Sequence, residues 1–557
     1  MDLSHELAQR KGRGAFFTPD PIAEWLAGWA IRDKPYAKVL DPTCGEAVFL
    51  LSAAGRLRSL GVEGDLRNQL FGVDLHRASL DSAAELLTSK HRASATLIED
   101  DFTSLESPAQ LGHSLPMMDA VIGNPPFVRY QEHRGDARKS SAAAALAQGV
   151  RLSGLASSWA ALLVHAAAFL KDDGRLAMVL PAELLTVHYA EPIRRWLRKR
   201  FAAVRMVFFD HLQFADAEEQ VVLVAAEGSG GCDSITLMEV ESAEDLANLH
   251  ALDPFSAVPA DEGKWTDLLM VPSHRQLFQR TSGERFTTLT AFGKPELGTV
   301  TGANSFFTLS EATRQEFQIP ERYLQRISPP GTKHLKSSTF SRGDWEELRC
   351  AGERVWLLQP NRLKNGSAPA GVRSYLKFGE SLKVQDAYKC TVRQDWWRPP
   401  AVSPPDLFFT YMSHRFPRII SNSAEVGFLN SMHGIRLGED ISSTMKEALP
   451  LLAFNSLTLL GAEIFGRAYG GGILKMEPRE AASLPVPRPD VAEEAWEKVA
   501  PQRTSLDQML VRGRWEEVVA VVDEILLRGV VGLEAADVDA LRVSGEGLRK
   551  RRTREPR

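Results

Sequence analysis

Short apolar runs alternate with longer helical patterns up to about residue 227, and this alternation constrains the fold more than any other feature. Seven runs rich in β-branched and aliphatic residues have the character of strands. They are AKVLD (37–41), LFGVDL (70–75), ATLIED (95–100), MDAVIGN (118–124), GRLAMVL (174–180), VRMVFFD (204–210) and QVVLVAAE (220–227). The helical patterns cover 19–31, 76–89, 157–171 and 191–201. Strands that alternate with helices predict a mostly parallel, doubly wound α/β sheet, in which ligands bind at the carboxyl ends of the strands.

The pattern changes after the Gly-Ser-Gly-Gly stretch at 228–231. A chain of 557 residues is long enough for two or three domains. We expect a first domain at 1–230, a connecting segment at 231–290, an α+β domain at 291–490 and a helical segment at 491–557. The final run, RKRRTREPR, is typical of a solvated and frayed tail, and contact with nucleic acid is the less favoured interpretation.

Composition places the chain among ordinary globular proteins, with 44% hydrophobic and 25% charged residues. The four cysteines have no Cys-x-x-Cys spacing, so we expect no disulfide framework, no zinc ribbon and no metal site. The N-terminus has no apolar signal core, and no apolar run approaches the roughly 18 residues needed to span a bilayer. We therefore expect a soluble protein of the reducing cytoplasm.

The net charge of −5 conceals a local asymmetry. The window from Arg322 to Arg398 contains fifteen Lys and Arg residues against seven Asp and Glu residues. An excess of basic residues in one window favours contact with a polyanion. This window is therefore the candidate nucleic-acid surface.

The first three predicted strands each end in an acidic residue. Asp41 precedes a tight turn through Gly45 into a helix, where backbone N–H groups can face a ligand. Asp74 ends the second strand, where a carboxylate can accept both hydroxyls of a ribose. At the third strand end, Asp101 could bond an adenine amine while Phe102 stacks nearby. The turn after Asp41 could equally be an ordinary connection, and capping of the following helix explains Asp74 equally well when it is taken alone and is again the alternative for Asp101.

The fourth strand ends in Asn124-Pro125-Pro126-Phe127, for which an ordinary turn is a poor explanation. Two prolines fix the backbone and remove two N–H donors, so the carbonyls of this loop are left without ladder partners. A turn needs neither the asparagine before the prolines nor the aromatic residue after them. The loop is therefore the candidate catalytic segment.

Taken in this order, the motifs resemble those of the γ class of S-adenosylmethionine-dependent amino-methyltransferases that act on DNA. The matching residues are Phe16-Phe17-Thr18-Pro19, Asp41-Pro42-Thr43-Cys44-Gly45, Asp74, Asp101-Phe102 and Asn124-Pro125-Pro126-Phe127. Four later segments look like the target-recognition region of such enzymes: 300–310, Asp395-Trp396-Trp397, Asn430-Ser431-Met432-His433 and 466–480. The resemblance covers residues 12 to 490.

The resemblance implies a Rossmann-like class I catalytic domain at 1–230 and a DNA target-recognition domain at 291–490. It implies that the donor is S-adenosylmethionine and that the partner is double-stranded DNA, in a bacterial or archaeal cell, beside a separately encoded restriction endonuclease if one exists. The residues that it assigns to the cofactor are Phe17, Thr18, Asp41, Thr43, Gly45, Asp74, Leu75, Asp101, Phe102 and Asn124.

Two positions depart from the family pattern. The turn after Asp41 has Ala47 where the family often has a further glycine, and alanine fits only if that position does not require a positive φ. Phe127 replaces the commoner tyrosine, which keeps the stacking surface and loses a hydroxyl.

The chemistry expected of the loop begins with an adenine amine whose lone pair is delocalised into the ring. The Asn124 side-chain oxygen and the Pro125 carbonyl can accept its two N–H groups and free the lone pair for in-line attack. The base must first leave the duplex stack, and Phe127 would then stack on its face. The resemblance assigns a second aromatic wall to Phe214, for which a place in the core is the competing interpretation.

Sequence recognition would fall to the basic window. The candidates for phosphate contact are Lys333, Lys336, Arg342, Lys377, Lys383, Lys389 and Arg393. The tryptophans of this window are better explained as core residues than as intercalating wedges. They are Trp345, Trp356, Trp396 and Trp397.

Other substrates offer an sp² amine to the same two acceptors. Cytosine N4 in DNA is the main rival because only the shape of the pocket separates it from adenine N6. Guanine N2 in ribosomal RNA and a protein glutamine amide are less favoured, because the chain has a large second domain and no recognisable RNA-binding module. A binding protein that has lost catalysis is disfavoured by the intact motifs, and no carboxylate-and-lysine nuclease core is evident.

Overall fold

The computed structural model describes residues 18–108, 115–128, 135–154, 156–209, 221–251, 254–259, 263–359, 368–401, 403–469 and 471–553. The chain divides into two compact units, Met1–Pro272 and Ser273–Glu555. Each unit has its own sheets and its own apolar core, so the two are described separately.

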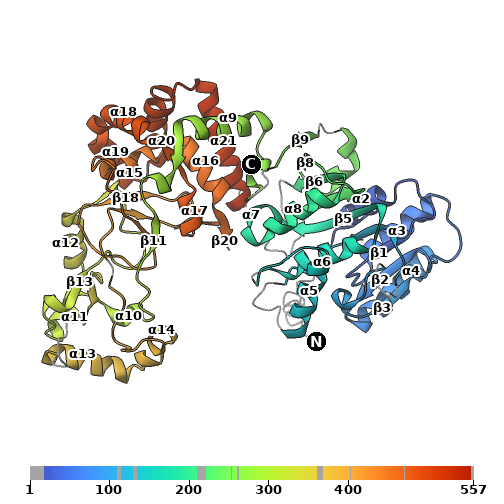
Figure 1. The fold of residues 1–557 in the computed structure, drawn as a ribbon, viewed down its shortest axis with the longest axis horizontal. Helices are drawn as coiled ribbons and strands as arrows, with labels where there is room; N and C mark the ends of the chain where they lie inside the picture. The colour runs from blue at the N-terminus through green and yellow to red at the C-terminus, as the bar shows by residue number, and fades with distance from the viewer. Residues whose placement is uncertain are drawn as a thin grey trace. The chain divides into compact units, whose positions relative to one another are not determined.

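The described part of the first unit contains a nine-stranded sheet in the order β3-β2-β1-β4-β5-β7-β6-β8-β9 (Figure 1). Strands β1 to β5 run parallel, and β7 lies antiparallel between β5 and β6. The strands are β1 Val39–Asp41, β2 Leu70–Asp74, β3 Thr96–Glu99, β4 Met118–Gly123, β5 Leu170–Pro181, β6 Ala203–Phe209, β7 Val221–Glu227, β8 Ile235–Val240 and β9 Phe255–Ala257.

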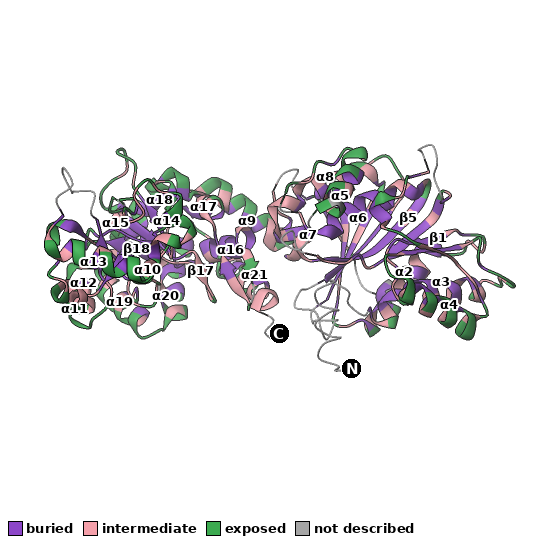
Figure 2. Ribbon diagram, turned by 90° about the horizontal axis from the view of Figure 1, so that it is seen from below, coloured by how far each residue is buried: buried purple, intermediate pink, exposed green. Residues whose placement is uncertain are grey.

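Helices cover both faces of this sheet, and the inner positions of the strands are buried (Figure 2). One core contains residues of α2, α3 and α4, and the other contains residues of α6, α7 and α8. The helices are α2 Asp20–Ile31, α3 Val48–Ser59, α4 Arg77–His91, α5 Gly135–Ala147, α6 Ser158–Ala166, α7 Glu183–Thr186 and α8 Glu191–Arg200. Burial on both faces explains why the strands are continuously apolar rather than alternating.

The seven strands and four helices predicted from the sequence are all present, and the α/β fold class is confirmed. The sheet also continues beyond residue 230, because β8 pairs with β6 and β9 pairs with β8. These two strands lie inside the expected connecting segment 231–290. The Gly-rich stretch at 228–231 is therefore a turn between strands of one sheet rather than the edge of a unit.

The second unit is built from small sheets surrounded by helices. Its largest sheet has the order β11-β19-β16-β18-β14, and a three-stranded sheet has the order β12-β15-β13. The strands are β10 Phe286–Thr288, β11 Pro295–Leu297, β12 Thr308–Leu309, β13 Leu324–Arg326, β14 Thr339–Phe340, β15 Trp356–Leu358, β16 Leu407–Phe409, β17 Met412–Ser413, β18 Ile419–Asn422, β19 His433–Ile435, β20 Arg467–Tyr469, β21 Ile473–Lys475 and β22 Pro485–Pro487. This mixture is the expected α+β domain.

The helices of the second unit fall into two groups. Helices α10, α11, α13 and α14 gather at one end of the unit (Figure 1). The helices are α9 Pro272–Arg285, α10 Asn304–Phe307, α11 Glu311–Glu316, α12 Arg342–Cys350, α13 Ala370–Ser381, α14 Tyr388–Thr391, α15 Met445–Leu452, α16 Ser456–Phe465, α17 Pro478–Ala482, α18 Pro489–Val499, α19 Arg503–Val511, α20 Trp515–Val522 and α21 Ala535–Thr553. Among the described residues, no single helix is long and apolar enough to cross a membrane; only α15 and α16, bent by 78°, meet that test as a pair.

The C-terminal helices belong to this unit and do not form the separate segment expected at 491–557. Asp523 accepts hydrogen bonds from the backbone N–H and the hydroxyl of Ser456, the first residue of α16, at 2.8 and 2.6 Å. Arg552 forms a bidentate ion pair with Glu463 of α16, with nitrogen–oxygen distances of 2.7 and 2.8 Å. Both side chains are almost fully buried, so the beginning of the basic tail is anchored rather than frayed.

Candidate active site

The order of the strands reverses between β1 and β4, which makes their carboxyl ends the switch point of the sheet. Asp41 ends β1 at this point and is only 1% exposed. The backbone N–H of Thr43 donates to Asp41 Oδ1 at 3.1 Å, while Oδ2 is buried and receives no hydrogen bond from the described residues. Burial, opposed by the Thr43 hydrogen bond and reinforced by the charge of Asp74, raises the pKa of Asp41 to about 8.

The loop that follows β4 lies directly against this carboxylate. A Cβ atom on Gly123 would lie 2.9 Å from Asp41 Oδ1, so only glycine allows the two strand ends to approach this closely. The hydroxyl of Thr43 lies 3.5 Å from the backbone carbonyl oxygen of Asn124. The turn after β1 and the loop after β4 are therefore in contact across the switch point.

Asn124 is held so that its amide oxygen remains available. Its Nδ2 atom donates to the hydroxyl oxygen of Thr18 at 3.2 Å, which fixes the orientation of the amide. Its Oδ1 atom is buried and receives no hydrogen bond from the described residues. A buried acceptor without a donor costs about 1 to 3 kcal/mol, so Asn124 Oδ1 is available to a donor from outside the described residues.

The rest of the loop is held by a residue that the sequence did not single out. The Ser158 hydroxyl, at the start of α6, donates to the Pro126 carbonyl and accepts from the Val128 N–H at 3.0 Å. The Ser158 N–H donates to the Val128 carbonyl at 3.1 Å. Phe127 is partly buried and contacts both apolar cores of the unit.

The turn after β1 differs from the expectation at one residue. We expected alanine to fit at position 47 only if this position did not require a positive φ. Ala47 nevertheless has a φ of +69°, in the left-handed region. Gly45, with a φ of +49°, donates its N–H to Asp74 Oδ2 at 3.0 Å. That N–H therefore ties β1 to β2 and does not face a ligand. Asp74 Oδ1 accepts from the His76 N–H at 2.9 Å, so each oxygen of Asp74 has one backbone donor.

The third strand end adopts the capping arrangement. Asp101 Oδ1 accepts from both the N–H and the hydroxyl of Thr103, at 2.9 and 2.8 Å. The Phe102 ring is 2% exposed and packs at 5.1 Å from His165 and at 5.0 Å from Phe169. Because both of its neighbours are core side chains, the ring does not present a face for stacking, in contrast to the expectation.

Three more residues were assigned to the cofactor or to the target base, namely Leu75, Phe17 and Phe214. Leu75, directly after Asp74, is 63% exposed, which leaves an apolar surface at the carboxyl end of β2. Phe17 and Phe214 lie outside the described residues.

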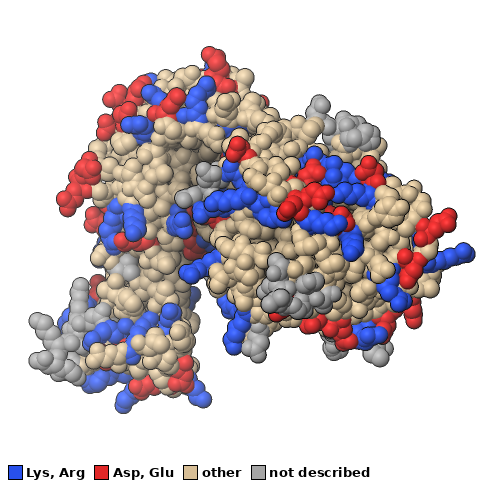
Figure 3. Space-filling model, turned by 45° about the vertical axis from the view of Figure 1, so that its right-hand side comes forward, with Lys and Arg blue, Asp and Glu red and all other residues tan. Residues whose placement is uncertain are grey.

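The basic window of the second unit lies largely on the surface. Lys333, Lys336, Arg342, Lys377, Lys383 and Lys389 are exposed, and Arg393 is half-buried. Arg393 donates to the Val300 carbonyl at 2.7 Å, so it has a structural partner. On the face shown in Figure 3, basic side chains are interspersed with acidic ones.

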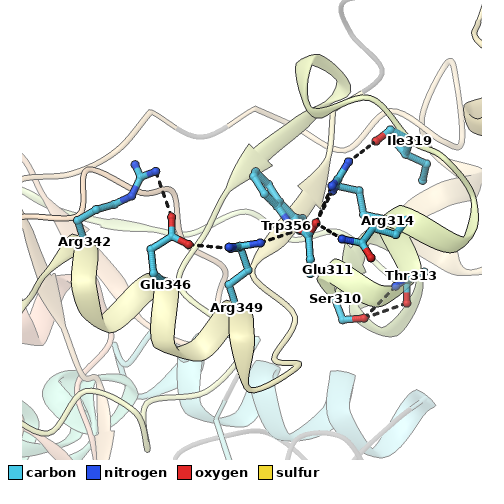
Figure 4. A network of polar contacts seen from close by, with 10 residues as sticks. Ser310, Glu311, Thr313, Arg314, Ile319, Arg342, Glu346, Arg349 and Trp356 are labelled. Carbon is cyan, nitrogen blue, oxygen red and sulfur yellow. Dashed lines mark hydrogen bonds and ion pairs between the residues drawn. The ribbon is translucent and has the colours of Figure 1, made fainter.

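Arg342 belongs to a chain of polar contacts that links α12 to α11 (Figure 4). Glu346 pairs with Arg342 at 3.3 Å and with Arg349 at 2.7 Å. Glu311 accepts from the Trp356 indole at 2.9 Å and from Arg314 at 2.6 Å, and the Arg314 hydrogen bond is the main cause that lowers the pKa of Glu311 to about 2. This network has a structural role, so Arg342 is a weaker candidate for phosphate contact than the lysines.

Exposed aromatic and apolar side chains lie beside the lysines on and next to α13 and α14. Tyr388 is 74% exposed, and the Lys389 ammonium lies 5.6 Å from the centre of its ring. Phe378 and Leu382 are also exposed on this surface. Trp345 and Trp356, in contrast, are buried, as expected of core residues.

A doubly wound sheet that brings an oriented amide and an unpaired carboxylate oxygen to its switch point has the architecture of class I methyltransferases. The Asn-Pro-Pro-Phe sequence of the loop is that of the members that methylate a planar amine. Residues 3–207 match the N-6 DNA methylase family, which supports an N6-adenine DNA methyltransferase. Residues 262–527 match the C-terminal domain of the Type II methyltransferase M.Eco57I.

Whole-length relatives agree with this assignment. The chain is 23% identical to the Type II methyltransferase M.AccI of Acinetobacter calcoaceticus over 86% of each chain. It is 24% identical to the Type II methyltransferase M.XamI of Xanthomonas campestris pv. amaranthicola over 85% of each chain. Its fold is similar to that of the Type IIL restriction-modification enzyme MmeI in complex with DNA, with a TM-score of 0.58 at 13% identity, over 99% of this chain and 80% of MmeI.

Proposed function

We propose that this chain transfers a methyl group from S-adenosylmethionine to N6 of an adenine that has been flipped out of double-stranded DNA. The buried Asn124 Oδ1, oriented through Thr18 and without a donor among the described residues, carries the proposal. An adenine amine would supply the missing hydrogen bond. Such a hydrogen bond helps to draw the amine nitrogen towards tetrahedral geometry, which methyl transfer to this nitrogen requires.

The chain activates the amine by accepting its two hydrogens. Asn124 Oδ1 accepts one and the Pro125 carbonyl accepts the other, which draws the nitrogen towards tetrahedral geometry and localises its lone pair. S-adenosylmethionine, when bound, supplies a methyl group on a sulfonium that such a nitrogen can attack directly. Phe127 stacks on the flipped base and keeps the amine between the two acceptors. No covalent enzyme intermediate is required.

Four of the residues assigned to the cofactor have atoms or surfaces available for different parts of S-adenosylmethionine. Asp41 offers a buried, unpaired Oδ2 that suits the ammonium of the methionine part, directly or through water. Asp74 keeps lone pairs for the ribose hydroxyls beyond its two backbone donors, and the exposed Leu75 offers an apolar surface to the adenine ring. Asp101 Oδ2 is the oxygen that remains for the adenine amine, because both hydrogen bonds from Thr103 end on Oδ1.

The second unit provides target recognition in this proposal. The lysines of α13, of α14 and of the segment before α12 contact phosphates and set the position of the duplex. A few other side chains of residues 291–490 would then reach base edges. We further propose that the enzyme is the modification partner of a separately encoded restriction endonuclease, as supported by its similarity to Type II methyltransferases.

Expression in a methylation-free bacterial host, followed by long-read sequencing of the host DNA, tests the proposal. The expected result is N6-methyladenine at one sequence context, and its absence from a strain that expresses Asn124→Ala. N4-methylcytosine at a fixed context would assign the pocket to the rival base. Unmodified DNA, together with methylation of RNA or protein by the purified enzyme, would overturn the proposal.

A further inference from the structure

Two hydroxyl groups bracket the catalytic loop from opposite sides. The Thr43 hydroxyl, on the turn after β1, lies 3.5 Å from the Asn124 carbonyl oxygen. The Ser158 hydroxyl, on the first turn of α6, donates to the Pro126 carbonyl. Between them, the Pro125 carbonyl receives no hydrogen bond from any described residue. The carbonyls of Asn124 and Pro126 each have a hydroxyl partner within the chain, and the Pro125 carbonyl between them is available to a ligand.

Ser158 makes the stronger of these two contacts. Besides donating to Pro126, its oxygen accepts from the Val128 N–H at 3.0 Å, and its own N–H donates to the Val128 carbonyl at 3.1 Å. Ser158 is 6% exposed, so water does not easily replace these bonds. Three hydrogen bonds from one buried residue fix the backbone just after the two prolines.

The prolines make this anchor necessary. Neither Pro125 nor Pro126 has an N–H, so the loop cannot be held through donors of its own at those positions. The direction of the Pro125 carbonyl is then set by the peptide planes on either side of it, which Thr43 and Ser158 hold. Ser158 does not itself need to contact the base.

We propose that Ser158 is a positioning residue for methyl transfer: its hydroxyl holds the Pro126 carbonyl away from the substrate and thereby directs the Pro125 carbonyl at the target amine. The inference rests on the proposed function of the loop. A small displacement of a catalytic acceptor can lower the rate of the chemical step by about 100-fold without affecting ground-state binding. The hydroxyl of Ser158, rather than its size, is the feature that matters.

Threonine and valine at position 158 form a matched pair, because they have nearly the same shape and differ in the hydroxyl. We expect Ser158→Thr to keep the single-turnover rate of DNA methylation within a few-fold of wild type. Ser158→Val and Ser158→Ala should lower that rate by about 10- to 100-fold. All three should bind S-adenosylmethionine and the duplex with wild-type affinity, measured by calorimetry and by fluorescence anisotropy. Ser52→Ala, on α3, controls for the loss of a serine hydroxyl elsewhere in the unit and should leave the rate unchanged.

A purely structural role for Ser158 predicts a different result. The valine and threonine variants would then share one rate, or the valine variant would lose cofactor and DNA binding in proportion to its loss of rate, and either outcome overturns the inference. Melting temperatures identify a variant that fails to fold; if Ser158→Val does so, the comparison of Ser158→Ala with Ser158→Thr decides instead. Asn124→Ala in the same assay separates the two claims, because activity retained by that variant would contradict the function of the loop itself.

Discussion

Replacement of Asp41 by asparagine is expected to stabilise the unliganded protein, and to do so increasingly as the pH rises. Burial holds the pKa of Asp41 at about 8 in the folded chain, against an ordinary value of 3.8. The folded state therefore binds this proton more tightly than the unfolded state. The tighter binding of this proton stabilises the folded state fully below about pH 4, and this stabilisation is lost as the pH rises towards 8.

The magnitude follows from the gap between the two pKa values. One pKa unit corresponds to about 1.4 kcal/mol, so from pH 5 to pH 8 the wild type should lose about 4 kcal/mol of unfolding free energy relative to Asp41→Asn. Asparagine has nearly the same shape and carries no charge at any of these pH values. Its carbonyl oxygen can still accept the Thr43 N–H, so the local turn should persist.

Urea unfolding of both proteins at pH 5, 6, 7 and 8 measures this difference. Asp523→Asn provides a comparison, because burial raises the pKa of Asp523 to about 6 and its pH-dependent difference should level off there. Unfolding free energies of wild type and Asp41→Asn that stay parallel from pH 5 to pH 8 would refute the reasoning. They would mean that water or a neighbouring group solvates Asp41 in the folded chain.

Two further predictions concern the second unit. Arg552→Ala should cost about 3 to 5 kcal/mol of unfolding free energy, because it leaves Glu463 buried without its partner. Replacement of both residues, as Glu463→Met with Arg552→Leu, should recover most of that loss. If urea unfolding shows no recovery, the loss in Arg552→Ala does not come from an unpaired Glu463. Lys389→Ala should weaken DNA binding about equally for all sequences and lower the salt dependence, plotted as log K against log salt, by about one. Lys90→Ala, on α4, should change neither quantity, and a Lys389 variant with an unchanged slope would exclude a phosphate contact.

The strands and the catalytic loop could be predicted because their signals are local. Apolar runs of strand length and the adjacent prolines at 125 and 126 are visible without knowledge of any partner. The order of the strand ends then placed Asp41 and Asn124 at one edge of the sheet, where the structure brings their loops together.

Ser158 could not be found in this way because it lies 32 residues from Pro126 along the chain. A pair of serines before an apolar helix is typical of an N-cap, and that ordinary explanation conceals the contact. In the structure the N-cap residue Ser157 makes no capping hydrogen bond through its side chain, while Ser158 bonds the loop. Only the packing of α6 beside the loop reveals this role.

Two of the three remaining differences have the same physical origin. Alanine adopts a positive φ only uncommonly, so an alanine at position 47 did not indicate the left-handed conformation that it has in the structure. Phe102 was expected to stack beside the cofactor, and its neighbours His165 and Phe169 place its ring in the core instead. The run that contains Arg552 was predicted to be solvated because its partner Glu463 lies 89 residues away. The outcomes at Phe102 and Arg552 each depend on a partner distant in sequence.

Single-turnover methylation by Asn124→Ala tests the central claim most directly. The assay uses a duplex that carries the context found by long-read sequencing, with binding of S-adenosylmethionine measured in parallel by calorimetry. We predict that wild type forms N6-methyladenine and that the variant forms none detectable while binding the cofactor with near wild-type affinity. Transfer at an undiminished rate by Asn124→Ala, or loss of cofactor binding that accounts for the whole defect, would contradict the role assigned to the loop.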